Sequence, residues 1–141
     1  MSSDITQSAE SLRSKVDRLE HEMLNLPQIE IPVQHGFGPG FYARTITIPA
    51  GATITGKVHA TEHIFMVTKG DITLITDDGV LRVQAGYQAV CKPGMKRAGH
   101  AHAETVCVNI HITDETDLAK LESDLIIAPA LEAPEVQEAL A

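Results

Sequence analysis

A series of short, regularly spaced β-type segments between residues 41 and 113 is the feature that most restricts how this chain can fold. The segments are rich in β-branched and aromatic residues, and turn sequences such as Asp77-Asp78-Gly79 separate them. We predict strands over residues 41–48, 63–68, 72–76, 80–83, 88–91 and 105–113, with weaker ones near Lys57 and Arg97. Many short strands at this spacing indicate an all-β sandwich or barrel.

Helices are predicted on both sides of the β-rich region. Before Pro27, apolar residues recur at spacings of four and three, which is typical of an amphipathic helix. They are Ile5, Ala9, Leu12, Val16, Leu19, Met23 and Leu26. Two interpretations stay open: the helix packs on its own domain, or it forms a short coiled-coil seam between subunits. Near the other end, Leu118, Leu121 and Leu125 share one helical face after a run of acidic residues.

The chain has 141 residues, which is the size of one ordinary domain with appendages. We expect an amphipathic helix over residues 1–27 and an extended arm, rich in proline and glycine, over 28–40. A β-barrel should occupy residues 41–113, and a helix with an acidic tail should occupy 114–141.

Composition narrows the range of partners. The net charge of -8 disfavours general binding to nucleic acid or to anionic membranes. The N-terminus lacks the basic start and apolar stretch of a signal peptide, and no apolar run reaches the length of a membrane span. We therefore expect a cytoplasmic protein without nucleic-acid or membrane partners. Cys91 and Cys107 lie in β-type segments and are expected to be buried and reduced.

Two histidines precede a β-type run. The spacing around them is Gly51, five residues, Lys57-Val58-His59, three residues, His63, six residues, Gly70. This spacing resembles the first motif of the cupin superfamily, in which two histidines and a glutamate bind a metal. Lys57 stands at the position of the first histidine and His63 at that of the glutamate, so only His59 matches the motif outright.

The second cupin motif is present in a looser form. Gly86, Pro93 and Gly94 follow its order, with six residues between Gly86 and Pro93. Arg97 stands where the family has its last metal-binding histidine, and Ala101 stands where it has an asparagine. The resemblance implies a cupin-type β-barrel or jelly roll. The wider chain also resembles small cupin proteins encoded by bacteriophages and prophages, for which no activity is established.

Two kinds of site are consistent with these residues. In the first, a basic pocket binds a phosphate or carboxylate, because arginine offers a planar fork of donors and lysine a point charge. Its candidate residues are Lys57, His59, His63 and Arg97, with Arg44 and Tyr42 from one face of the strand over residues 41–48.

In the second kind of site, His59 and His63 bind a divalent transition metal, which could be Fe, Mn, Ni, Cu or Zn. The third ligand is then His100, His102 or His35. His111 alternates with Ile110 and Ile112 and is interpreted as an ordinary sheet residue.

The sequence therefore predicts a small cupin protein that binds a small polar or anionic ligand in a basic barrel pocket. One alternative is a metal-dependent cupin enzyme of the oxygenase, isomerase or lyase class. Another is an oligomeric structural or interaction protein with a vestigial pocket. Whether the protein is an enzyme stays open, and we expect a homo-oligomer.

Overall fold

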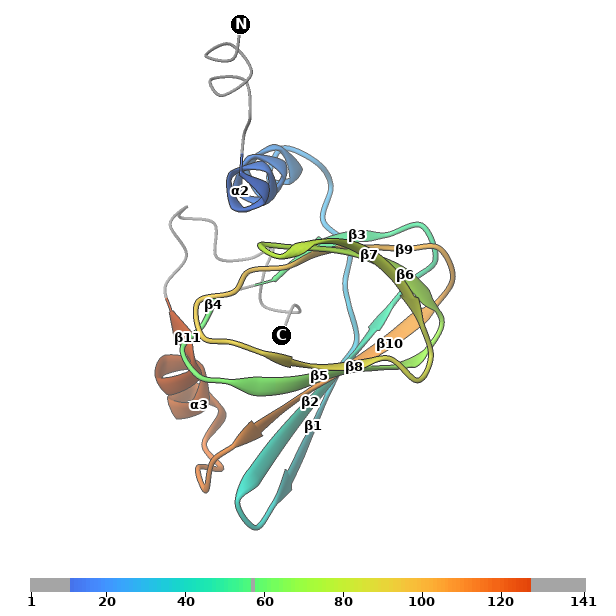
Figure 1. The fold of residues 1–141 in the computed structure, drawn as a ribbon. Helices are drawn as coiled ribbons and strands as arrows, with labels where there is room; N and C mark the ends of the chain where they lie inside the picture. The colour runs from blue at the N-terminus through green and yellow to red at the C-terminus, as the bar shows by residue number, and fades with distance from the viewer. Residues whose placement is uncertain (1–10, 57, 128–141) are drawn as a thin grey trace, which may run out of the picture.

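The computed structural model describes residues 11–56 and 58–127, which form two larger antiparallel sheets, one two-stranded sheet and two flanking helices (Figure 1). The strands are β1 (Val33–Gly38), β2 (Phe41–Ile48), β3 (Thr53–Thr55), β4 (Val58–His59), β5 (His63–Lys69), β6 (Asp71–Thr76), β7 (Gly79–Gln84), β8 (Gln88–Cys91), β9 (Ala98–Ala101), β10 (Thr105–Ile112) and β11 (Ile126–Ile127). The helices are α2 (Leu12–Met23) and α3 (Leu118–Leu125). The predicted all-β architecture with an N-terminal and a C-terminal helix is confirmed.

The five-stranded and the four-stranded sheet face each other and enclose the core (Figure 1). One has the strand order β1-β2-β10-β5-β8, and the other has the order β3-β9-β6-β7. Alternate residues of each strand point between the sheets, so the buried residues recur with period two. The inward apolar residues include Ile46, Ile48, Phe65, Val67, Ile72, Leu74 and Cys107. Cys91 and Cys107 are both buried and free, as predicted.

The turn between β5 and β6 depends on a glycine. Gly70 has φ of 98°, a backbone conformation that side chains with a Cβ rarely adopt. A Cβ at this position would also collide with the Glu104 carbonyl and with Thr105. The turn therefore brings the chain close to the start of β10, which lies beside β5 in the sheet.

Helix α2 packs on the barrel of its own chain. Val16 and Glu20 are its buried residues. The Lys96 ammonium, 1% exposed, donates to Glu20 Oε1 at 2.6 Å and to Asp17 Oδ1 at 3.0 Å. Thr55 Oγ of β3 donates to the other Glu20 oxygen at 2.8 Å. The described part of the helix thus packs on its own domain, while Ile5 and Ala9 of the seam lie outside the described residues.

The segments on either side of the predicted barrel also contribute strands, β1 to the five-stranded sheet and β11 to a two-stranded sheet with β4. The arm expected over residues 28–40 contains β1, which pairs with β2. After α3, strand β11 pairs with β4, so that Ile126 lies opposite His59. Neither described helix has the length and apolar character needed to cross a lipid bilayer.

Candidate metal centre

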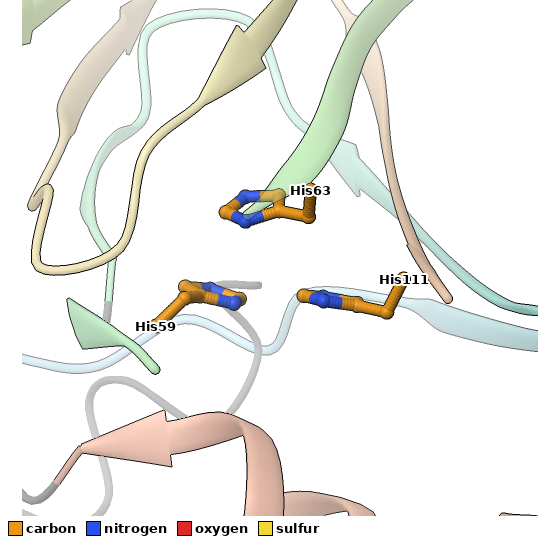
Figure 2. A group of neighbouring side chains, drawn as sticks. All are labelled: His59, His63 and His111. Carbon is orange, nitrogen blue, oxygen red and sulfur yellow. The ribbon is translucent and has the colours of Figure 1, made fainter. Parts of the chain in front are cut away.

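Three buried histidines converge from three different strands (Figure 2). They are His59 of β4, His63 of β5 and His111 of β10, each between 2% and 4% exposed. One ring nitrogen from each lies within 4.8 Å of those from the other two. The ring centroids of His59 and His63 are 4.4 Å apart, and those of His63 and His111 are 4.7 Å apart.

The strand register places two of these histidines side by side. Ile110 of β10 lies opposite Ile64 of β5. Because the strands are antiparallel, the residue after Ile110, His111, lies opposite the residue before Ile64, His63. Both side chains point inward because the residues on either side of them point outward. His59 approaches from the short strand β4, whose backbone is held by the pairing with β11 and by a hydrogen bond from Gly94 N to the His59 carbonyl.

The hydrogen bonding of His63 suits a metal ligand. Its Nδ1 lies 3.3 Å from the Thr61 carbonyl, which can only accept a hydrogen bond. Nδ1 therefore carries the proton, and Nε2 presents its lone pair toward the other rings. Histidines that bind a metal through one ring nitrogen usually donate the N–H of the other to a carbonyl or carboxylate oxygen. Within the described residues, neither His63 Nε2 nor His111 Nδ1 has a hydrogen-bond partner, although both atoms are buried.

Two of the three rings are neutral at pH 7. Burial, and then the positive charge of Arg97, lower the pKa of His63 to about 4. Burial, His63, Arg97 and Arg44 lower the pKa of His111 to about 4. A metal needs the neutral form of imidazole, so these two rings are available to an ion at neutral pH without losing a proton.

The donor set fits one transition-metal ion. Three nitrogens at the 2.0–2.1 Å typical of zinc–imidazole bonds lie about 3.3–3.6 Å apart in a tetrahedral or trigonal site, so movements of about 1 Å bring the three rings to a bound spacing. Three protein ligands leave a coordination position for a water or a substrate, which is the pattern of catalytic rather than structural sites.

Arg97, which stands at the position of the family's last ligand, does not join the histidines. Its guanidinium donates to Asn109 Oδ1 at 3.1 Å and to Cys91 Sγ at 3.0 Å. It also lies 4.3 Å from the centroid of the Phe65 ring. Arg97 is thus held inside the barrel by neutral and aromatic groups, and its burial lowers the pKa of the guanidinium from its usual value.

The other residues of the predicted basic pocket are spread around the centre. Tyr42 stacks on His111 with 6.2 Å between ring centroids, and its hydroxyl lies 2.7 Å from His35 Nδ1. Arg44 shares the inward face of β2 with Tyr42, and its buried Nε has no hydrogen-bond partner in the described part of the chain. Lys57 lies outside the described residues.

The structure does not bring His100 and His102 to the centre. His100 is exposed on β9, and His102 is exposed just after the end of this strand. His100 Nδ1 lies 2.8 Å from Thr53 Oγ, and His102 Nε2 lies 2.7 Å from Thr73 Oγ. His35 is likewise exposed and contacts Tyr42 rather than the three rings.

Sequence reasoning missed His111 as a possible ligand. The signal was its place in β10, where Cys107, Asn109 and His111 alternate with the apolar residues Val108 and Ile110. Cys107, Asn109 and His111 are all buried, so the face of β10 that carries the polar residues is the one that points into the barrel. A strand whose polar residues point inward is a sign of a site in the core.

Comparisons with known proteins identify the fold. No family model and no curated protein matches the sequence. Solved structures do match. They include KdgF from Halomonas sp., with TM-score 0.54, 14% identity and coverage of 65% of this chain and 88% of that one. An RmlC-like cupin from Shewanella frigidimarina matches with TM-score 0.53, 18% identity and coverage of 64% and 89%.

A third similar structure is the DMSP lyase DddQ from Ruegeria pomeroyi, with TM-score 0.52 and 16% identity. The match covers 62% of this chain and 49% of the lyase chain. At these identities the similarity concerns the fold alone, and the fold is that of the cupins. The cupin-type barrel expected from the two motifs is therefore confirmed.

Proposed function

We propose that this chain is a metal-dependent cupin protein in which His59, His63 and His111 together hold one divalent transition-metal ion. The observation that carries the proposal is the convergence of three buried imidazoles, with ring nitrogens within 4.8 Å of one another. Buried polar atoms normally have partners, so the two orphaned nitrogens of His63 and His111 call for a ligand.

The nature of the ligands narrows the choice of metal. Imidazole suits Zn, Cu, Fe and Ni, whereas Mn prefers oxygen ligands. A set of three imidazoles therefore favours the first four over Mn among the predicted metals. When bound, such an ion would supply a Lewis acid and an open coordination position.

The alternative of a metal-free anion pocket receives less support from the geometry. Because the pKa values of His63 and His111 lie near 4, neither ring carries a charge that would attract an anion at neutral pH. The positive charge near the centre belongs to Arg44 and Arg97. We therefore propose that Arg44 favours a small polar or anionic substrate beside the metal, for an enzyme of the oxygenase, isomerase or lyase class.

Metal analysis tests the proposal directly. Elemental analysis of the full chain, purified without a histidine tag, should give close to one transition-metal ion per chain. His59→Ala, His63→Ala and His111→Ala should each lower the metal affinity by at least about tenfold, because each removes a direct ligand. Circular dichroism would show that the variants stay folded.

The exposed histidines at the end of β9 and just after it provide matched controls. His100→Ala and His102→Ala remove the same chemical group from the outer surface of the barrel and should leave the metal content unchanged. Metal that is lost in these two variants but kept in His111→Ala would place the site elsewhere and contradict the proposal.

A second candidate function is that of an oligomeric interaction protein, and one observation favours it. The outer face of the five-stranded sheet is mostly apolar over β2, β10, β5 and β8, and its charged residue is Lys69 at the end of β5. Ile112 is 82% exposed on this face and Val90 is 61% exposed. Large exposed apolar faces mark protein contacts, so we propose that this one joins copies of the chain in a homo-oligomer.

A further inference from the structure

A second hollow lies apart from the three histidines. It has a volume of about 310 Å³ and lies beside β5, β6, β7 and β8. Phe65, Leu74, Leu81, Tyr87 and Met95 form much of its wall. None of the three converging histidines lines it, so it is separate from the candidate metal centre.

The cavity opens where the barrel wall is incomplete. β7 and β8 are the edge strands of their sheets. Leu81 of β7 pairs with Leu74 and lies two residues before the buried Val83, so both side chains are on the inward face. Yet Leu81 is 51% exposed, because no described strand covers this part of β7. An inward apolar side chain is thus open to solvent at the mouth of the cavity.

One positively charged group lines this apolar cavity. Arg97 contributes to its wall beside Phe65 and Cys91. The bonds to Asn109 and Cys91 fix the plane of the guanidinium, and the Phe65 ring supports it. A guanidinium held in one orientation on an apolar surface presents a fixed positive charge to a carboxylate.

Size and charge narrow the class of ligand. A volume of 310 Å³ holds about ten non-hydrogen groups, at roughly 30 Å³ for a group of the size of water. The apolar wall favours an aliphatic or aromatic body. Asp78 also lines the cavity, and its carboxylate disfavours a ligand with a second negative charge. We infer that the cavity binds a monocarboxylate with an apolar body of about this size, with its carboxylate on Arg97.

Octanoate is a suitable probe, and octanol is its uncharged counterpart. Isothermal titration of the full chain at neutral pH, with EDTA present, should show one octanoate per chain. Octanol should bind at least about tenfold more weakly, because it lacks the negative charge that the Arg97 guanidinium attracts. EDTA removes any ion from the histidines, so the result does not depend on the proposed metal centre.

Three variants locate the binding site. Arg97→Gln should weaken octanoate binding by at least about tenfold and leave octanol binding unchanged. Leu81→Trp changes a half-exposed residue and should block the mouth for both probes without loss of the fold. Arg82→Gln removes an exposed arginine from the same strand as Leu81 and should have no effect.

Three results would overturn the inference. The first is equal affinity for octanoate and octanol, and the second is no binding of octanoate at millimolar concentration. The third is unchanged octanoate binding in Leu81→Trp.

Discussion

Burial of His63 and His111 couples the stability of the metal-free protein to pH. Each pKa falls from the usual 6.5 to about 4 on folding, so between these values the unfolded chain binds more protons than the folded one. The free energy of unfolding should therefore fall as the pH decreases from 6.5 toward 4, by up to roughly 1.4 kcal/mol per pH unit for each histidine. Urea denaturation in the presence of EDTA at a series of pH values measures this dependence.

A variant separates this effect from the titration of carboxylates. His111→Gln keeps a polar side chain of similar size but cannot take up a proton, so its stability should depend less steeply on pH within the same range. His100→Gln, at an exposed position, should retain the steep dependence. Identical pH profiles for the native chain and His111→Gln would show that His111 is not buried as a neutral ring.

The residues of the site differ in how far sequence could predict them. His59 and His63 lie next to each other in the barrel, as the first cupin motif indicates. The third histidine of the group could not be assigned, because His111 comes from a strand outside the motifs and meets His63 only through the register of β5 and β10. Similarly, the position of Arg97 in the second motif gave no indication that it donates to Asn109, which is distant in sequence and reached only in the folded barrel.

At the scale of the elements, helix α2 depends on one buried ion pair. Glu20 is fully buried and Lys96 is 1% exposed, and their charged atoms are 2.6 Å apart. Removing Glu20 leaves the buried Lys96 ammonium with the partly exposed Asp17 as its remaining carboxylate among the described residues, so Glu20→Ala should lower the free energy of unfolding by up to about 3–5 kcal/mol. Replacing both residues, as in Glu20→Leu with Lys96→Met, should recover most of this loss, since the double variant buries no charge in the pair. Chemical denaturation measures both effects.

An exposed ion pair provides the control for this prediction. Lys69 and Glu104 have charged atoms 2.6 Å apart, but their side chains are 61% and 56% exposed. Lys69→Ala should therefore change stability by less than about 1 kcal/mol. If Glu20→Ala cost no more than Lys69→Ala, the pair between Glu20 and Lys96 would not anchor the helix.

Sequence predicted the longer elements better than the contacts between them. The periodicity of two located β2, β5, β6, β7, β8 and β10 closely, because each is long enough to alternate several times. Strands β4 and β11 have two residues each, too few for a period, and they exist because they pair with each other. The apolar spacing of α2 is equally consistent with an intramolecular and an intersubunit helix. Glu20 forms its ion pair with Lys96 of the loop before β9, so the described part of the helix packs on its own domain.

At the scale of the whole molecule, charge is distributed unevenly. The chain has a net charge of -8, and 21% of its residues are charged. Apart from Lys69, which lies at the end of β5 opposite Val106, the outward positions of four neighbouring strands carry no charge. They are Phe41, Ala43, Thr45 and Thr47 of β2; Val106, Val108, Ile110 and Ile112 of β10; Ile64, Met66 and Thr68 of β5; and Gln88 and Val90 of β8. A face with so little charge on an acidic protein lacks the repulsion that would otherwise keep two copies apart.

Oligomerisation through this face can be tested with charges placed at its centre. β10 is the central strand of the five-stranded sheet, so Val108→Lys together with Ile112→Lys introduces two charges into the proposed interface. The native chain should be a homo-oligomer in light scattering coupled to gel filtration, and the double variant should be a monomer, because an unpaired buried charge is costly. Leu26→Lys, at a residue that is 60% exposed beyond α2, is the control and should leave the mass unchanged. Dissociation by Leu26→Lys alone would place the interface at the N-terminal helix, where the apolar seam of the sequence also permits one.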